Sequence, residues 1–351
     1  MKHFIEPCLT PRGEVMIYRL ENKSGASVTL SSLGAGITSI IVPDSRGQLA
    51  DVVLGYARVA DYLHDGPCMG KVPGRYANRI AGGRLMIDGK LHQLAINNGP
   101  NALHGCPEGF QNQIWDAELA GNNRVVFTLV SPDGDEHYPG ELQARVAYTW
   151  TDDNVLKIEL NAVTNAPTVV NLTNHTYFNL AGEGSGTVLD HELFIDATHW
   201  LPTDDTLIPT GEIAPVAGTP MDFTRLKPIG RDIKQDFAAL NYGKGYDNCW
   251  VLDADNRYEL STAVKLRHRA TGRTLDVLTD QPAVQIYTGN WLNGCPTGKD
   301  GHVYHDYDGV AIECQGMPDA PNKPNFPSQL LRPNEEYNRV IFFVFGNEPA
   351  S

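Results

Sequence analysis

Short runs of strand-forming residues, separated by turn residues, recur along the whole chain and restrict it to folds built from many short strands. The runs are rich in Val, Ile, Leu, Phe and Thr, and many alternate apolar with polar positions, as half-buried β-strands do. They lie at residues 27–33, 37–42, 84–89, 90–96, 124–130, 142–150, 155–163, 191–196, 258–268, 274–279, 284–289 and 340–346. Asp88-Gly89 joins two of them and is a signature of a tight hairpin. The pattern predicts an all-β fold of packed antiparallel sheets.

Helical periodicity is confined to two short segments, 57–63 and 231–240, so we expect only a few short helices. The 351 residues include 34 Gly and 23 Pro, and this turn-rich composition also favours short elements. Hydrophobic residues make up 41% of the chain, which is enough for a sizeable core. No internal repeat and no linker-like stretch divides the sequence.

The acidic charge balance bears on the partners of the chain. With a formal net charge of −14, nucleic acids and anionic membrane surfaces are not expected as partners, because both require a basic patch. The charge also argues against a phosphorylated substrate, although a local cluster of Arg and Lys would override the average.

Targeting signals and disulfide patterns are not evident. Residues 1–13 lack the apolar run of a signal peptide, and no stretch of about 18 apolar residues predicts a transmembrane helix. The six cysteines are scattered and show no CxxC spacing. We therefore expect reduced thiols that fill the core and a cytoplasmic location.

The segment NLTNHTYFNL, residues 171–180, has an unusually polar face when it is read as a strand. Because side chains alternate between the faces of a sheet, one face then carries Asn171, Thr173, His175, Tyr177 and Asn179. The opposite face is mostly apolar and is expected to pack on a core. A polar face centred on a histidine suits the wall of a cleft that binds a molecule rich in hydroxyl groups. A solvated outer strand has the same pattern, so the segment alone does not decide.

A second segment, residues 310–328, begins as a short strand and continues as a proline-rich loop. Glu313 and Gln315 alternate with branched and apolar residues in the strand, so they face away from the core. Prolines at positions 318, 321, 324 and 327 predict a stiff, non-helical loop. A carboxylate at the end of a strand, beside a rigid loop, is a candidate catalytic group, although a structural role is common for a single Glu.

These two segments and five others resemble the aldose 1-epimerase (galactose mutarotase) family. The motifs are NLTNHTYFNLAG, the Glu before PDAPNKPNFPS, GRYANRIAGG (74–83), NNGPNALHG (97–105), SPDGDEHYPG (131–140), GYDNCW (245–250) and VQIYTGNWL (284–292). They keep the order of the family and extend over nearly the whole chain. The resemblance implies one domain over residues 1–351, folded as a single large antiparallel β-sandwich, a galactose mutarotase-like supersandwich with the sugar site on its concave face.

The resemblance also implies an isomerase that interconverts the α and β anomers of free hexoses such as D-galactose and D-glucose. In this reaction a base takes the proton of the C1 hydroxyl while an acid protonates the ring oxygen. Rotation about C1–C2 then presents the other carbonyl face, and the ring closes again. One carboxylate and one imidazole are sufficient for these transfers, so neither a metal nor a cofactor is expected. Matched to the family motifs, Glu313 is the expected base and His175 the expected acid.

The remaining site residues come from the same motifs and are expected to bind the substrate. They are Asn78, Arg79, His104, Tyr177, Asp247 and Gln285. An Arg suits adjacent hydroxyls because its fork offers several fixed donors. By alternation Tyr177 should face the site, whereas Thr176 should not. The chain departs from the family pattern at Cys106, Asn248 and Cys249, which are neither the acid nor the base.

The two catalytic roles predict a pH dependence. The base must be ionised and the acid protonated, so the pH–rate profile should be bell-shaped. Glu313 would then limit the acid side, and His175 the alkaline side.

Three alternative functions are considered. A hexose-6-phosphate 1-epimerase would need a cationic cluster near C6 of the sugar, for which Arg225, Lys227 and Arg231 are the nearest candidates. A non-catalytic sugar-binding protein would not need both an acid and a base. A glycoside hydrolase normally uses two carboxylates rather than a carboxylate and an imidazole.

Two further points concern metals and assembly. The H-x-x-H spacing in HVYHDYD (302–308) is interpreted as a surface loop, because no third or fourth metal ligand follows a clear pattern. The expected partner is a small aldose, and the chain is expected to be a monomer or a homodimer.

Overall fold

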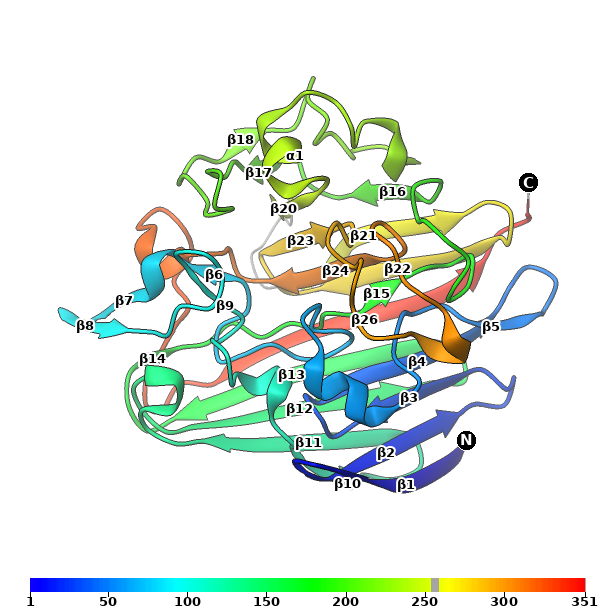
Figure 1. The fold of residues 1–351 in the computed structure, drawn as a ribbon, viewed down its shortest axis with the longest axis horizontal. Coiled ribbons are helices and arrows are strands. Elements are labelled where there is room, and N and C mark those ends of the chain that lie inside the picture. The colour runs from blue at the N-terminus through cyan, green and yellow to red at the C-terminus, as the bar shows by residue number, and fades with distance from the viewer. Residues whose placement is uncertain (254–258, 351) are drawn as a thin grey trace.

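The computed structural model describes residues 1–253 and 259–350, which form two layers of antiparallel β-sheet (Figure 1). One layer is a nine-stranded sheet in the order β10-β11-β12-β13-β26-β22-β21-β16-β19. Its strands are β10 (Asp116–Leu119), β11 (Arg124–Ser131), β12 (Leu142–Trp150), β13 (Val155–Thr164), β26 (Tyr337–Asn347), β22 (Arg273–Thr279), β21 (Ser261–His268), β16 (Glu192–Ile195) and β19 (Lys227–Pro228).

The other layer consists of a five-stranded and a six-stranded sheet. The first contains β1 (Lys2–Thr10), β2 (Gly13–Glu21), β3 (Ser27–Ser31), β4 (Gly36–Pro43) and β5 (Leu49–Asp51), in that order. The second contains, in spatial order, β15 (Tyr177–Phe178), β24 (Val310–Gln315), β23 (Ala283–Tyr287), β20 (Asp247–Val251), β17 (His199–Leu201) and β18 (Ala214–Pro215). An antiparallel bridge between Val53 and Phe178 joins the two sheets, so they form one nearly continuous layer.

The remaining elements are short. Three two-stranded sheets pair β6 (Arg79–Ile80) with β9 (Ala102–Leu103), β7 (Arg84–Ile87) with β8 (Lys90–Gln93), and β14 (Thr168–Val169) with β25 (Leu330–Leu331). The one α-helix of the described residues is α1 (Ala238–Gly243). The 3-10 turns are η1 (Val59–His64), η2 (Ala81–Gly83), η3 (Phe110–Asn112), η4 (Asp135–His137), η5 (Ile229–Arg231), η6 (Lys299–Gly301) and η7 (Ala320–Asn322). No helix among the described residues has the length and apolar character needed to cross a membrane.

The hydrophobic core lies between the two layers. Tyr18 on β2 meets Phe127 on β11 edge-to-face at a ring-centroid distance of 6.2 Å. Phe178 on β15 meets Phe343 on β26 in the same way at 5.0 Å. One face of the nine-stranded sheet therefore packs on both sheets of the other layer, which confirms the predicted antiparallel sandwich.

The alternation of β24 decides which of its side chains face the core. Val310, Ile312 and Cys314 belong to the main apolar cluster, as predicted, so Glu313 projects from the opposite face of the sheet. Its neighbour across the ladder is Gln285 on β23. The outer face of the six-stranded sheet thus carries polar side chains from several strands.

The segment 171–180 differs from the prediction, because only Tyr177 and Phe178 belong to a strand. The residues before them pair with the irregular segment 70–77, where Lys71 and Gly70 bond to the backbone of His175. The side chain of Asn174 also accepts a bond from the Thr176 amide, a local turn that competes with a ladder. Within this segment every side chain is buried, so it is not a solvated outer strand.

The N-terminal hairpin of β1 and β2 was not predicted, although Asp88-Gly89 does join β7 to β8 as expected. Strand β1 is an edge strand whose side chains are mostly exposed, so it needs no apolar alternation and tolerates Pro7. The predicted run 258–268 forms β21 from Ser261, while Tyr258 lies outside the described residues.

The two predicted helices are shorter than expected. The segment 57–63 corresponds to the 3-10 turn η1, and in the segment 231–240 helix α1 begins only at Ala238. Turns precede α1, and an ion pair of Lys227 with Asp232 at 2.7 Å holds this part of the chain. The proline-rich loop contains the single 3-10 turn η7, so it is not entirely non-helical.

Candidate active site

A cleft of about 870 Å³ opens on the outer face of the six-stranded sheet, within the usual volume range of small-molecule sites. Seven of the eight predicted site residues line it. They are Asn78, Arg79, His104, His175, Tyr177, Asp247 and Glu313. The eighth, Gln285, lies behind the cleft wall and donates a bond to Asp247. The structure therefore brings together residues from six separate sequence motifs.

His175 and Glu313 meet at the floor of the cleft. Nε2 of His175 lies 3.4 Å from Oε1 of Glu313, and the two residues are 4% and 2% exposed. The other polar atoms of these side chains, His175 Nδ1 and Glu313 Oε2, are buried without a hydrogen-bond partner. Buried polar atoms are normally paired, so these atoms are poised to bind a polar ligand.

Burial moves the pKa values of this pair in opposite directions. Loss of hydration lowers the pKa of His175 to about 4. The same effect raises the pKa of Glu313 well above its ordinary value, and the negative charge of Asp247 adds to the rise while Arg79 opposes it. Both shifts disfavour the charged forms, so the resting pair holds one proton on Glu313 and a neutral imidazole.

His104 is held in one tautomer by the backbone. Its Nδ1 accepts a hydrogen bond from the amide of Asn78 at 3.0 Å, so the proton of the neutral ring resides on Nε2. Burial and the neighbouring His175 keep the pKa of His104 well below its ordinary value, so the ring is neutral at neutral pH. The rings of the two histidines lie edge-to-face at 5.3 Å. His104 can therefore donate a hydrogen bond beside the catalytic pair.

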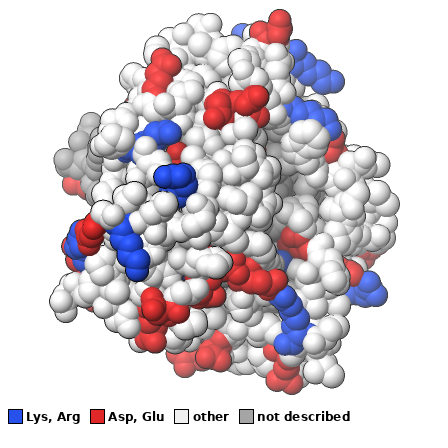
Figure 2. Space-filling view, turned by 60° about the vertical axis from the view of Figure 1, so that its left-hand side comes forward, with Lys and Arg blue, Asp and Glu red and all other residues white. Residues whose placement is uncertain are grey.

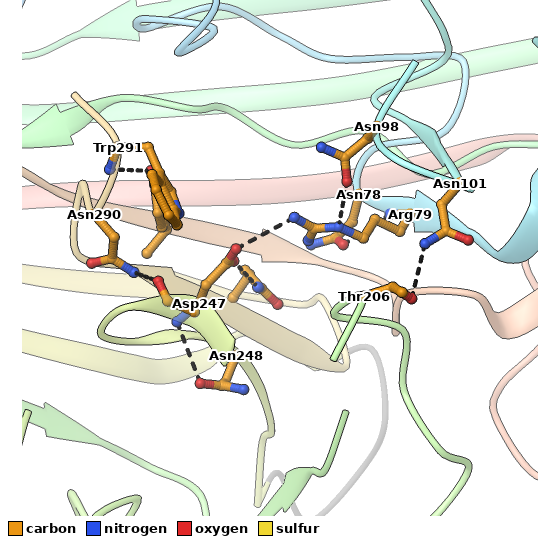
Figure 3. A network of polar contacts seen from close by, with 12 residues as sticks. Asn78, Arg79, Asn98, Asn101, Thr206, Asp247, Asn248, Asn290 and Trp291 are labelled. Carbon is orange, nitrogen blue, oxygen red and sulfur yellow. Dashed lines mark hydrogen bonds and ion pairs between the residues drawn. The ribbon is translucent and has the colours of Figure 1, made fainter. Parts of the chain in front are cut away.

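A chain of polar contacts links Asp247, Arg79 and Asn98 along one wall of the cleft (Figure 3). The amide of Gln285 donates to Asp247 Oδ1 at 2.7 Å, and Nη2 of Arg79 lies 3.5 Å from Asp247 Oδ2. Nε of Arg79 donates to Oδ1 of Asn98 at 3.1 Å. The Oε1 atom of Gln285 is buried and unpaired. This wall offers both donors and acceptors, as recognition of several hydroxyl groups requires.

Only two members of the predicted polar face line the cleft. Tyr177 does, and its hydroxyl donates to the carbonyl of Pro67, whereas Thr176 is turned away as expected. The remaining three hold the fold. Asn171 donates to the carbonyl of Ala77, Thr173 to that of Cys314, and Asn179 to those of Gly186 and Asp308. Alternation places them on the polar side but cannot tell a ligand-binding amide from one that holds a loop.

The fully buried Arg75 in the GRYANRI motif has a structural role. Its guanidinium donates to the carbonyl of Gly140 and to the hydroxyl of Ser131, both at 2.7 Å, in the SPDGDEHYPG segment. Burial lowers its pKa to about 10, so it is still a cation at neutral pH. This contact joins two of the sequence motifs and holds the packing behind the cleft wall.

Among the described residues, two clusters have the residue types of a metal site. In the first, His104 offers only a protonated Nε2, which leaves His175 and Glu313 as possible ligands. In the second, Nε2 of His191 accepts a bond from the amide of Leu180, so the Nδ1 that faces Asp190 carries the proton. The hydrogen bonds therefore remove one ligand from each cluster.

The loop HVYHDYD does not form a third cluster among the described residues. His302 bonds to Glu183 at 2.8 Å, His305 is exposed, and Tyr304 is buried with its hydroxyl bonded to Glu183 and Gly55. The loop is therefore more firmly packed than the predicted surface loop. Cys8 and Cys295 are likewise only half-buried, whereas the other four cysteines fill the interior as expected.

Several cleft residues were not predicted individually. Asn98, Tyr287 and Trp291 lie in the quoted motifs NNGPNALHG and VQIYTGNWL, but nothing in their spacing indicates a role. His64 and Asp205 come from segments outside any motif. Only the folded chain brings these loops to the rim of the cleft.

Comparisons with known proteins agree with this geometry. The family model described as aldose 1-epimerase matches residues 16–343. The chain is 46% identical over 319 residues to a galactose mutarotase of Sus scrofa, with 91% of each chain covered. It is 38% identical over 342 residues to an aldose 1-epimerase of Escherichia coli, with 97% of this chain and 98% of the relative covered.

Solved structures show the same fold. An aldose epimerase homologue from C. elegans matches with a TM-score of 0.86 at 33% identity, covering 94% of this chain and 98% of the other. A galactose 1-epimerase from Lactobacillus acidophilus also has a TM-score of 0.86, at 28% identity and 99% coverage of both chains. Together with the cleft and its histidine–carboxylate pair, these matches establish that the chain belongs to the aldose 1-epimerase family.

Proposed function

We propose that this chain interconverts the α and β anomers of a free hexose, with Glu313 and His175 as the proton-transfer pair. The observation that carries the proposal is their contact at 3.4 Å on the floor of the cleft. The C1 hydroxyl and the ring oxygen of an aldopyranose are both bonded to C1. An acid and a base that act on these two oxygens must therefore lie side by side, as this pair does.

The proposed reaction moves one proton in each direction. The proton of the resting pair first passes from Glu313 to His175 across their contact. Glu313 as carboxylate then takes the proton of the C1 hydroxyl while His175 as imidazolium protonates the ring oxygen, and the C1–O bond to the ring oxygen breaks. Rotation about C1–C2 follows, and the reverse transfers close the ring on the other face of the aldehyde. Each positioned group typically contributes about 10²- to 10⁴-fold to such a reaction.

The remaining cleft residues are proposed to hold the sugar. His104 donates from Nε2 near the reacting oxygens, because its other ring nitrogen is occupied by the Asn78 amide. Arg79 and Asp247 offer a donor fork and an acceptor for hydroxyls further along the ring. Gln285 is proposed to act on the sugar through Asp247, to which its amide donates.

A neutral sugar fits this cleft better than a sugar phosphate. Arg79 is its only lining Arg or Lys among the described residues, and it faces Asp247, while Asp205 adds further negative charge. Lys227 of the candidate cationic cluster is instead buried against Asp232. A phosphate would thus meet mostly carboxylates, which disfavour it electrostatically.

Several features support the expected organisation and partners. The main core draws on residues from Tyr18 to Phe345, as one domain over residues 1–351 requires. Figure 2 shows basic and acidic side chains in small groups without a broad basic surface on that face, in accord with the formal charge of −14 and with no nucleic-acid partner. All six cysteines are free thiols, which suits a reducing, cytoplasmic location. A monomer or a homodimer remains our expectation.

Optical rotation tests the function directly. Freshly dissolved α-D-galactose and α-D-glucose, followed in a weakly catalytic buffer, should reach the same final rotation faster when the protein is present. The ratio of the two rates would rank the sugars. Lack of acceleration with either sugar, from a folded sample, would refute the proposal, and hexose 6-phosphates would then be tested.

We expect a bell-shaped pH–rate profile in which His175 limits the acid side and Glu313 the alkaline side. This is the reverse of the assignment that the sequence predicts, because burial shifts both pKa values. In its active state the pair of Glu313 and His175 carries one transferable proton, with a net charge of zero. Its acid limb should mark uptake of a second proton by His175, whose pKa is lowered to about 4. Its alkaline limb should mark loss of the last proton from Glu313, whose pKa is raised. The initial rates of optical-rotation change across pH test this, and a profile that falls below pH 6 with no alkaline limb would contradict it.

A further inference from the structure

Beyond the residues matched to the family, we propose that Asn98 is a positioning residue that orients the Arg79 guanidinium for sugar binding. This inference rests on the proposed function, because it assigns Asn98 a part in binding the same sugar. Oδ1 of Asn98 accepts the Nε proton of Arg79 at 3.1 Å, and Figure 3 shows Asn98 on the far side of the guanidinium from Asp247.

The contacts of Arg79 leave most of its donors free. A guanidinium has five N–H groups in a fixed plane. One donates to Asn98, and Nη2 makes a long contact of 3.5 Å with Asp247. The remaining N–H groups therefore have room to bind hydroxyls in the cleft that Arg79 lines. The contacts with Asn98 and Asp247 fix the plane of the guanidinium and therefore the direction of these N–H groups.

The group that accepts the Nε proton of Arg79 is the neutral side-chain amide of Asn98, not a carboxylate. A carboxylate in this place would form a second ion pair and reduce the positive charge that Arg79 presents to the cleft. An amide oxygen holds the plane of the guanidinium without such competition. Asn98 can therefore orient Arg79 while the cation remains available to Asp247 and to the sugar.

The position of Asn98 is itself fixed by a tight turn. Asn98 and Asn101 exchange two backbone hydrogen bonds, each of 3.0 Å, across Gly99 and Pro100. Gly99 has a φ of +56°, which a residue with a side chain adopts less readily.

The side chain of Asn101, which is buried, anchors the turn to two neighbouring segments. Its Oδ1 accepts the amide of Gly82 at 3.0 Å, and its Nδ2 donates to the hydroxyl of Thr206 at 3.1 Å (Figure 3). These two hydrogen bonds hold the turn from both sides, so Asn98 keeps one position relative to Arg79.

The test compares three variants for steady-state mutarotation of galactose and for galactose binding by calorimetry. Asn98→Ala should raise KM and Kd about tenfold, the loss expected for a hydrogen bond to a charged group, with kcat within about threefold of wild type. Asn98→Asp keeps an acceptor at the same place but adds a charge that competes for the cation, so it should bind galactose better than Asn98→Ala and more weakly than wild type. Asn123→Ala is the matched control and should leave KM and Kd unchanged, because Asn123 does not line the cleft and bonds instead to the carbonyl of Trp150.

The outcomes separate this inference from the proposed function. Unchanged KM and Kd in Asn98→Ala would overturn it, and equal losses in Asn98→Ala and Asn98→Asp would assign Asn98 to loop structure alone. Wild-type protein that binds galactose but does not accelerate mutarotation would refute the catalytic proposal. In that case the Kd values of the variants would still decide whether Asn98 positions Arg79.

Discussion

Replacement of Glu313 by Gln is expected to lower kcat for mutarotation by about 10²- to 10⁴-fold while the chain stays folded. The amide has the same shape as the carboxylate but cannot take a proton from the C1 hydroxyl. Its position on β24 is fixed by the ladder to Gln285 and by the apolar residues on either side, none of which depends on the charge. Optical rotation measures the rate, and thermal melting measures the fold.

The stability of this variant provides a second, independent readout. Burial raises the pKa of Glu313 above that of a Glu in the unfolded chain. The unfolded chain therefore loses this proton at a lower pH than the folded chain, and the free energy of unfolding falls as the pH rises above the unfolded pKa. A neutral Gln removes this cost, so Glu313→Gln should be at least as stable as wild type at pH 8. Glu336→Gln, the same change at an exposed position, should alter neither rate nor stability. A rate within tenfold of wild type would remove Glu313 from the role of base.

Replacement of His175 by Asn is expected to reduce kcat by a similar factor, about 10²- to 10⁴-fold. Asn can donate a hydrogen bond to the ring oxygen but cannot transfer a proton to it. The backbone of His175 is held by Lys71 and Gly70 and does not depend on the imidazole, so the segment should keep its conformation. The rate is again measured by optical rotation, and circular dichroism confirms the fold.

Asn179→Ala is the matched control for the same segment. Its amide holds the carbonyls of Gly186 and Asp308, so the change should cost about 1–3 kcal/mol of stability yet leave KM unchanged. Near-wild-type activity of His175→Asn would refute its role as acid. His104, whose Nε2 carries a proton beside the site, would then be tested in its place.

Local patterns in the sequence were sufficient for much of the fold. Alternation along β24 predicted that Glu313 faces away from Val310 and Ile312, and Asp88-Gly89 predicted the hairpin of β7 and β8. Both are decided within a few residues, because a strand places successive side chains on opposite faces and a two-residue loop restricts φ. The motifs also named the cleft residues through the family resemblance.

Other features could not be read from local patterns, because they depend on partners far away in the sequence. The hairpin of β1 and β2 has no apolar alternation, since its edge strand has little to bury. Asn171 and Asn179 belong to the same polar face as His175, yet their amides bond to loop carbonyls around residues 77, 186 and 308. Which polar side chain reaches the cleft depends on where those loops pass.

The sequence by itself determined that the chain is all-β, which face of β24 carries Glu313, and which family it belongs to. Only the tertiary structure decided that His175 and Glu313 touch and that a backbone amide fixes the proton of His104 on Nε2. The contact arises because β15 pairs with β24. Glu313 lies in β24 and His175 lies just before β15, so the pairing brings together two residues that are 138 positions apart in the sequence. Alternation is a property of the local backbone, whereas this convergence follows from the order of strands in the sheet and from the loops packed at its edge.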